Sequence, residues 1–444
     1  MDLSDNRVRD SRETAPSAFS KVAPLPVTVR VTTLPNGLRV ATDEMPGIET
    51  ATVGVWTNCG ARNETVVENG VAHLLEHMLF KGTARRSARE IAEEIEAVGG
   101  QMNAYTAREN TAYYARVLKE DVGLAVDIVA DLLQNSVFDE AELARERSVV
   151  LQEIGQANDT PDDIIFDHFQ SAAYPDQAIG RPVLGTPDTV AGMPRSALTG
   201  YLAEHYVPSE MVLTAAGAVD HDRLVDQAYS LFHGLPARDA RKPSPVRYVG
   251  GEFREDEDLE QLHFVLGFSG AAITDPDYYA QSVLSTLLGG GMSSRLFQEV
   301  REKRGLVYAI YTFASAYRDG GIFGIYAGTG AAEIAELVPV VCDELSKVVE
   351  GVTEGEIARA RAQLKSGLLM SLESTMSRAE QLGQHLLLFG RAITTQEIIG
   401  RIDAVDAAAV RRAAHKLFTT KPTIAALGPI AQLESVERIA ARLS

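Results

Sequence analysis

Two histidines and a glutamate, His73, Glu76 and His77, are the side chains of this chain best suited to catalysis. They lie in an apolar, helix-favouring run without Pro or Gly. On a helix, residues at i, i+3 and i+4 share one face. Two neutral imidazoles one turn apart can bind Zn²⁺, and a neighbouring carboxylate can take a proton from water that the metal activates. The order H-x-x-E-H therefore predicts a zinc site with Glu76 as general base. Because so short a pattern also arises by chance, the prediction needs a third ligand.

Two helices would position such a site. Asn69 is the expected N-cap of the helix that carries the histidines. A later helix is predicted to begin after Asp139, which can cap it with Glu142 as the reciprocal partner three residues on. This later helix carries Glu146 and Glu153, which are seven residues apart and so lie on nearly the same face. It is the natural source of a further metal ligand.

With these motifs the chain resembles the pitrilysin-type (inverzincin) zinc metallopeptidases, in particular the β-subunit of mitochondrial processing peptidase and its bacterial single-chain relatives. The resemblance implies one Zn²⁺ per chain, held by His73, His77 and Glu153, with Glu76 as the catalytic base. It also implies that Glu146 orients a histidine ligand from behind. The alternative for Glu146 is a plain surface charge.

The resemblance places a substrate-binding strand beside the metal. Residues 101–106 are predicted to form a strand at a sheet edge, to which an extended peptide can add through main-chain hydrogen bonds. Asn103 and Ala104 match the positions that bind substrate in the family. For Asn103 the alternative is an amide that stabilises a turn.

The resemblance also assigns a substrate-binding role to Arg301 and Tyr308, which are seven residues apart in the second half of the chain. In the family such a pair reaches across to the active site of the first domain. Both side chains could hold the substrate carbonyl and stabilise the charge that develops on its oxygen. The alternative is that Tyr308 lies in a sheet core and Arg301 on the surface.

The chain of 444 residues is too long for one ordinary core, and its two halves repeat. Residues 352–357 have the same capping pattern as residues 138–143, at an offset of 352 − 138 = 214. At that offset Glu153 corresponds to Gly367, and the second half has no H-x-x-E-H. Two similar domains are therefore expected, of which only the first has a metal site.

The predicted fold is α+β, with two homologous domains that each form a mainly antiparallel sheet with helices on one face. The resemblance implies that they enclose a chamber. The expected boundaries are a mobile N-terminal arm at residues 1–26, a catalytic domain at 27–234, a linker rich in Pro, Gly and basic residues at 235–254, and a substrate-binding domain at 255–444.

Composition limits the classes of partner and the cellular locations that we expect for the chain. The net charge of −19 argues against nucleic acid as a partner and fits a basic substrate; the alternative is that the charge only aids solubility. With Cys59 and Cys342 as its two cysteines, the chain fits a reducing compartment. No apolar run is long enough for a membrane span, and the first residues lack the features of a signal or import sequence. A cytoplasmic location is expected.

The sequence thus predicts a zinc metalloendopeptidase that hydrolyses unfolded, basic peptides or presequence-like segments. Because one chain has both the zinc motif and the Arg301/Tyr308 pair, a homodimer is expected, with an inactive relative as the alternative partner. Two other functions stay open: a non-catalytic structural subunit of the same fold, and a metal-dependent lyase related to S-ribosylhomocysteine lyase.

Overall fold

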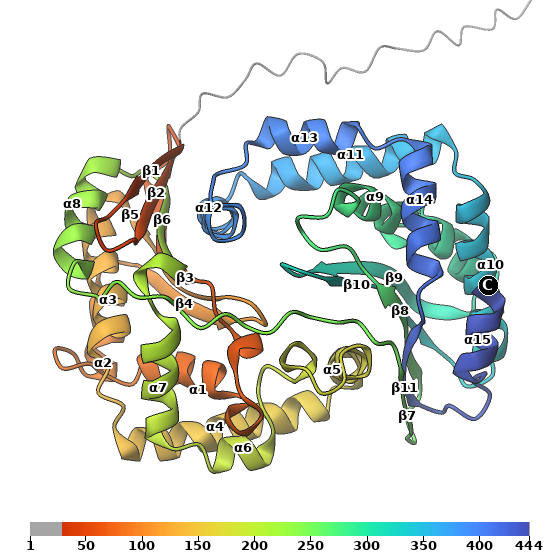
Figure 1. Cartoon of the computed structure of the whole chain (residues 1–444), viewed down its shortest axis with the longest axis horizontal. Coiled ribbons are helices and arrows are strands. Elements are labelled where there is room, and N and C mark those ends of the chain that lie inside the picture. Colours follow the sequence, from red (N-terminus) through yellow and green to blue (C-terminus); the bar gives the residue numbers. More distant parts are fainter. Residues whose placement is uncertain (1–28, 444) are drawn as a thin grey trace, which may run out of the picture.

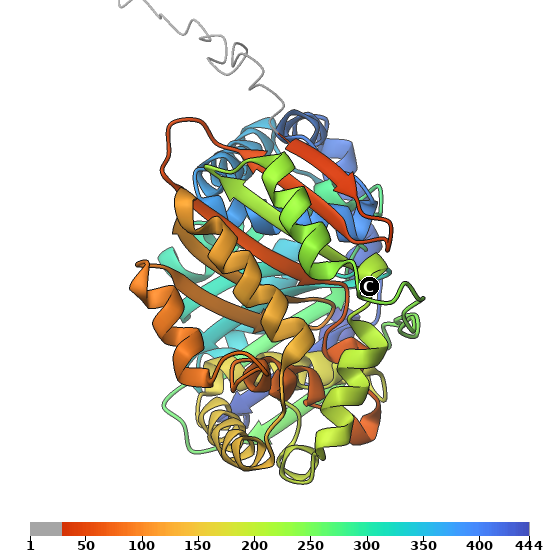
Figure 2. The same ribbon diagram turned by 90° about the vertical axis from the view of Figure 1, so that its left-hand side faces the viewer.

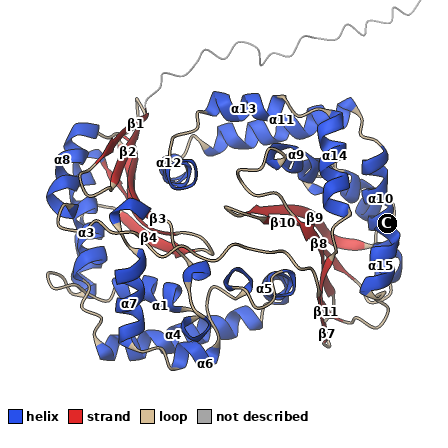
Figure 3. Ribbon diagram, viewed as in Figure 1, coloured by secondary structure: helices blue, strands red, loops and turns tan. Residues whose placement is uncertain are grey.

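The computed structural model describes residues 29–443, which form two β-sheets with helices around and between them (Figure 1). Residues 29–217 contribute the first sheet and residues 252–428 the second. The strands form two separate layers, each with helices on its outer side (Figure 3). The predicted N-terminal arm, residues 1–26, lies outside the described residues.

The first sheet has six strands in the order β1-β2-β6-β3-β5-β4. β2 and β6 are parallel, and the other neighbours are antiparallel. The Asn-Gly dipeptide at residues 36–37, which favours a hairpin turn, joins β1 to β2, and Gly37 has the positive φ of 96° that favours glycine. The strands are β1 (Val29–Thr33), β2 (Arg39–Glu44), β3 (Thr50–Thr57), β4 (Gln101–Thr106), β5 (Thr111–Leu118) and β6 (Met211–Gly217).

The second sheet repeats this topology. Its order, β7-β11-β8-β10-β9, matches β2-β6-β3-β5-β4, and its parallel pair, β7 and β11, occupies the same place. The predicted fold of two similar, mainly antiparallel α+β domains is therefore confirmed. The strands are β7 (Glu252–Asp256), β8 (Leu262–Ser269), β9 (Val307–Ala316), β10 (Gly321–Thr329) and β11 (Thr423–Gly428).

Helices cover the outer faces of both sheets. α3 and α8 lie across the first sheet, and Figure 2 shows this face toward the viewer. In the first half the α-helices are α1 (Val71–Leu79), α2 (Ala88–Ala97), α3 (Val122–Asn135), α4 (Glu140–Asn158), α5 (Pro161–Ala173), α6 (Pro187–Ala191), α7 (Arg195–His205) and α8 (His221–Phe232). In the second half they are α9 (Tyr278–Gly289), α10 (Ile334–Glu350), α11 (Glu354–Ser371), α12 (Thr375–Phe389), α13 (Thr395–Asp403), α14 (Ala407–Phe418) and α15 (Val436–Leu443).

Short helical turns connect these elements. They are η2 (Ala61–Asn63), η3 (Val66–Glu68), η4 (Lys119–Asp121), η5 (Ala178–Gly180), η6 (Pro208–Glu210) and a π-helix, η7 (Phe297–Glu302).

The offset of 214 seen in the sequence recurs in the structure. α4 and α11 begin at residues 140 and 354, and α5 and α12 begin at residues 161 and 375, a difference of 214 in both pairs. At this offset the buried Glu146 of α4 corresponds to the buried Ala360 of α11. The halves thus share a framework, but α11 has an apolar residue at the position where α4 has the carboxylate of Glu146.

The equivalent helices α5 and α12 each cross to the other half. α5 packs on β11, β8 and β7 of the second sheet, whereas α12 packs on β6, β3 and β2 of the first. Both helices lie between the two sheets in Figure 3. Each sheet is therefore covered on its inner face by a helix from the other half, so that neither half contains its complete core.

In both crossings an aromatic ring packs against a glycine, but the glycine belongs to the sheet in one crossing and to the helix in the other. On the second sheet, the ring of Phe169 in α5 fills the space above Gly267, where an added Cβ would lie 2.3 Å from the ring. On the first sheet, Gly383 in α12 leaves room for Trp56, and a Cβ there would lie 2.9 Å from the indole. A glycine is thus required at each crossing because the facing aromatic side chain takes its place.

An irregular segment connects the two halves of the chain. Residues 234–251 form no α-helix or β-strand, and β7 begins at Glu252, inside the predicted linker at 235–254. Buried Arg62 of the first half contacts Glu109, donates to Ser244 O in this segment at 2.8 Å, and pairs with Asp319 of the second half at 2.7 Å. The segment is thereby bonded to both halves.

We expect Gly383→Val to loosen α12 from the first sheet, because its side chain would overlap the Trp56 indole. The overpacking should lower the free energy of unfolding by about 1–3 kcal/mol. Trp56 is the single tryptophan of the chain and is fully buried, so its emission should also shift to longer wavelength.

Gly400→Val in α13 is the matched control, because no atom lies within 4 Å of the added Cβ. Its unfolding midpoint and its tryptophan emission should stay close to those of the parent. Equal behaviour of the two variants in urea titrations would contradict the close packing of α12 on Trp56.

Candidate metal centre

Helix α1 carries His73, Glu76 and His77, and a buried carboxylate holds its N-terminus. Glu64 accepts hydrogen bonds from the backbone N–H groups of Gly70 and Ala72, both at 2.9 Å, and from the Asn69 side chain at 2.8 Å. The predicted N-cap, Asn69, is therefore wrong: Gly70, with φ of 94°, occupies that position. Burial raises the pKa of Glu64 to about 7, although these donors favour its charged form.

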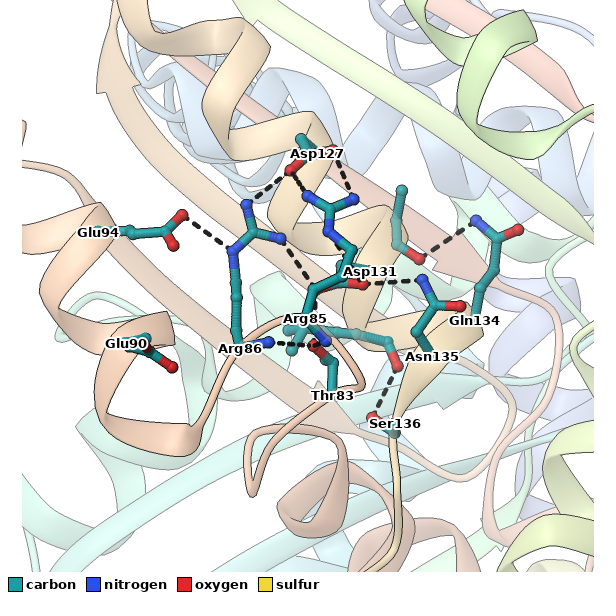
Figure 4. Close-up of polar contacts among 12 residues, drawn as sticks. Thr83, Arg85, Arg86, Glu90, Glu94, Asp127, Asp131, Gln134, Asn135 and Ser136 are labelled. Atoms are coloured by element: carbon teal, nitrogen blue, oxygen red, sulfur yellow. Dashed lines mark hydrogen bonds and ion pairs between the residues drawn. The ribbon is translucent and has the colours of Figure 1, made fainter.

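The C-terminal end of α1 is bonded to α3. Ser136 donates to Leu79 O at 3.2 Å, which satisfies one of the free carbonyl groups of the last turn. The loop that follows α1 is held by Arg86 and Thr83, which bond to the fully buried Asp131 at 2.9 and 2.7 Å (Figure 4). Both ends of the helix are thus fixed by polar contacts in addition to apolar packing.

The structure brings together the three predicted zinc ligands. Glu153 Oε2 of α4 lies 3.7 Å from His73 Nε2 and 3.6 Å from His77 Nε2. One ligand atom from each residue lies within 4.8 Å of the others. Ligands bonded to zinc at about 2.1 Å in tetrahedral geometry stand about 3.4 Å apart. The separations in this cluster therefore suit a single ion.

An unsatisfied carboxylate oxygen in this cluster is also consistent with a bound metal. Glu153 Oε2 is buried and has no hydrogen-bond partner among the described residues. A buried carboxylate oxygen without a partner is costly, and a bound cation would remove that cost. Burial, together with the nearby His77, lowers the pKa of His73 to about 4, so its imidazole is neutral at pH 7, as a ligand must be.

Glu146 contacts the cluster from behind. Its Oε2 lies 3.1 Å from His77 Nδ1, and its Oε1 bonds to Lys81 Nζ at 2.8 Å. The Glu146 side chain is 7% exposed, so it is not a plain surface charge. A carboxylate on Nδ1 makes that nitrogen the donor and directs the lone pair of Nε2 toward a metal. Glu146 therefore lies where an orienting residue has to lie, and its role stays a prediction.

Glu76 lies on the same helix and makes no bond to the other three residues. Thr106, the last residue of β4, donates to Glu76 Oε2 at 2.6 Å. Burial raises the pKa of the Glu76 carboxyl above its usual value, and the hydrogen bond from Thr106 partly offsets this effect. A carboxylate with a raised pKa is the better proton acceptor for work near neutral pH.

The predicted substrate strand, β4, is an edge strand that lies against α1. Asn103 Oδ1 accepts the Ala104 N–H at 2.8 Å, so the amide bonds to the strand itself and not to a turn. β4 pairs with β5 on one side and has no strand on the other. Its free edge is therefore available, in the described residues, for one more strand.

Arg301 and Tyr308 lie together in the second half. The Arg301 guanidinium stacks 5.8 Å from the centre of the Tyr308 ring, and also over Phe297 at 4.9 Å. Tyr308 is 75% exposed and is not part of the sheet core. Within residues 29–443, no hydrogen bond or ion pair joins either side chain to the histidines or to Glu153.

Sequence reasoning missed three residues that shape the site: Glu64, Lys81 and Thr106. The strand period of two could have indicated Thr106, which shares a face with Ala104. Glu64 precedes the helix by seven residues and contacts its N-terminus because η2 and η3 fold the chain back. No local sequence signal marks that contact.

Family comparisons cover most of the chain. The description "Insulinase (Peptidase family M16)" matches residues 39–187, and "Peptidase M16 inactive domain" matches residues 193–364. An uncharacterized zinc protease of Streptomyces coelicolor is 42% identical over 91% of this chain and 90% of its own length. A probable β-subunit of mitochondrial-processing peptidase from Arabidopsis thaliana is 42% identical over 93% of this chain and 81% of its own.

Solved structures share the fold. A protease from Helicobacter pylori superposes with a TM-score of 0.83 at 22% identity, over 90% of this chain and 99% of that one. A chain of complex III from Candida albicans superposes with a TM-score of 0.82 at 22% identity, over 94% of this chain and 99% of that one. At this identity the likeness shows the architecture alone.

We expect Glu153→Gln to lose most of its zinc, because the substitution removes a charged ligand. Glu146→Gln should keep a weaker site, with affinity about 10–100-fold lower, because it perturbs His77 without removing a ligand. Zinc content after dialysis against a graded chelator would measure both. Glu140→Gln, an exposed position at the start of α4, is the control and should match the parent. Full zinc retention in Glu153→Gln would exclude it as a ligand.

Proposed function

Because the chain belongs to the insulinase family of peptidases, we propose that it is a zinc-dependent endopeptidase that hydrolyses unfolded peptides or presequence-like segments. The observation that carries the proposal is the cluster of His73, His77 and Glu153 beside Glu76. In this cluster, three ligands converge on one point and the carboxylate of the general base stays free of them.

Each residue of the site has its own role in the proposed peptide hydrolysis. Zinc bound by the three ligands would polarise a water molecule and the scissile carbonyl. Glu76 takes a proton from the attacking water and passes it to the amine that leaves, while the hydrogen bond from Thr106 keeps its carboxylate in place. Glu146 holds the imidazole of His77. Water attack and proton transfer together cleave the peptide bond without a covalent enzyme intermediate.

We assign substrate binding to both halves. An extended peptide adds to the free edge of β4 at Asn103 and Ala104, where main-chain hydrogen bonds accept many sequences. Arg301 and Tyr308 approach from the second half and donate hydrogen bonds to a substrate carbonyl. The exposed phenol of Tyr308 supports this role, because its ring stacks with Arg301 and its hydroxyl has no hydrogen-bond partner within residues 29–443. A folded protein cannot present such a strand.

The finer features follow the same proposal. The net charge of −19 favours basic peptides, and their advantage should shrink as salt screens it. Cys59 and Cys342 are both buried free thiols, which supports a reducing, cytoplasmic location. No helix in residues 29–443 is long and apolar enough to cross a bilayer. We propose a homodimer, since each chain has both the ligands and the Arg301/Tyr308 pair.

The two alternative functions, a structural subunit and a lyase, account for fewer features of the structure. A non-catalytic subunit has no use for an intact Glu76 held by Thr106 next to the ligand cluster. A lyase related to S-ribosylhomocysteine lyase would need neither the second sheet nor a free strand edge. The hydrolytic function uses all three features.

We expect Glu76→Gln to lower the turnover of an unfolded peptide by about 10³-fold, because the amide cannot accept the proton. Zinc content should stay at one ion per chain, since Glu76 is not a ligand. Chelation of the parent should abolish activity, and added zinc should restore it. Zinc loss in a folded Glu76→Gln protein, or parental turnover, would contradict its role as the base.

Tyr308→Phe should lower kcat/KM by roughly 100-fold if its hydroxyl stabilises the developing charge. Tyr311→Phe, three residues along β9, is the matched control and should retain parental kinetics. Steady-state assays with a quenched fluorescent peptide would separate the two. Equal activity of Tyr308→Phe and Tyr311→Phe would remove Tyr308 from the site.

A further inference from the structure

Helix α12 places an acidic side chain beside β4, the strand to which we assign substrate binding. Glu380 accepts a hydrogen bond from the hydroxyl of Tyr105 at 2.8 Å, and Tyr105 belongs to the edge strand β4. Gln384, one turn on, donates to the same oxygen at 3.2 Å. The second half of the chain thus contributes a carboxylate to the rim of the strand that carries Asn103 and Ala104.

The strand alternation shows which side of the peptide this carboxylate would face. Met102 and Ala104 pack against the core that includes α1, and Thr106 bonds to Glu76. Tyr105 packs on the opposite face, with the cluster that includes Ala379 of α12. A peptide strand paired with β4 would alternate in the same way. Every second side chain would then point toward α12 and away from the metal centre.

Glu380 is half-buried and has no cationic partner within residues 29–443. This is unusual at the contact between α12 and the first sheet, where the neighbouring carboxylate, Asp43, pairs with Arg378 at 2.9 Å. A half-buried carboxylate satisfied only by a phenol and an amide keeps its charge uncompensated. A cation that arrived on a peptide would compensate it.

The carboxylate also lies close to the catalytic centre. Tyr105, which donates to Glu380 at 2.8 Å, is followed in β4 by Thr106, which donates to Glu76 at 2.6 Å. Consecutive residues of the strand thus contact the two carboxylates. A side chain that reached Glu380 would therefore belong to a residue near the cleaved bond.

We propose that Glu380 is a specificity-determining residue that binds an Arg or Lys side chain of the substrate, on the face of the peptide turned away from zinc. This assignment rests on the proposed peptidase function and on the addition of substrate to β4. It locates the preference for basic peptides at one side chain, and it predicts that the preference recurs at alternate peptide positions. The general negative charge of the chain would favour all positions alike.

Peptide binding tests the proposal without requiring turnover. The probe is a set of unfolded fluorescent peptides, identical except for one Arg or Gln moved along the sequence, bound to zinc-loaded protein carrying Glu76→Gln. Adding Glu380→Gln should lower the Arg-over-Gln affinity ratio about fivefold, as expected for one half-exposed ion pair. The loss should occur at alternate positions. An unchanged ratio, or an equal loss at adjacent positions, would overturn the assignment.

Two control variants separate charge from structure. Tyr105→Phe removes the hydrogen bond to Glu380 but leaves its charge, so the Arg preference should persist. Glu350→Gln removes an exposed carboxylate at the end of α10 and should leave the ratio unchanged. Parental Trp56 emission in Glu380→Gln would show that α12 stays docked. Absence of hydrolysis by the parent would refute the proposed function, while the binding ratio would still decide the role of Glu380.

Discussion

The placement of α1 is the constraint on which the site depends, because this helix carries both histidines and the general base. Its ends are held by polar groups: buried Glu64 at the N-terminus, and part-buried Ser136 with the Asp131 network at the C-terminus. Apolar packing is non-directional and tolerates small shifts along the helix axis. Hydrogen bonds to the helix ends are directional and do not tolerate such shifts. They therefore fix the position along the helix axis at which His73 and His77 meet Glu153.

The exchange of α5 and α12 explains why two halves with similar sheets act as one unit. Each helix supplies apolar cover to the other sheet, so separating the halves would expose both inner faces. The same exchange brings side chains of the second half to the first, as the contact of Glu380 with Tyr105 shows. The surface around β4 is thus built from both halves, although all three candidate ligands come from one.

The repeat also shows how one framework can carry chemistry in one copy and not in the other. α4 and α11 begin with the same capping pattern and lie at equivalent places. Buried Glu146 corresponds to buried Ala360, and Glu153 corresponds to Gly367. A buried carboxylate needs a partner, and in α4 the partners are a histidine and a lysine. Without them, a small apolar residue is the stable choice at that position.

The sequence by itself determined the local features: the helix with H-x-x-E-H, the capped helix of Glu153, the Asn36-Gly37 hairpin, and the repeat at 214 residues. Each depends on spacing within one element or on a short turn. The tertiary structure alone decided the contacts that join distant segments: Glu64 on the N-terminus of α1, Thr106 on Glu76, and the crossing of α5 and α12. Such contacts depend on how folded elements pack together, and periodicity and capping patterns do not predict that packing.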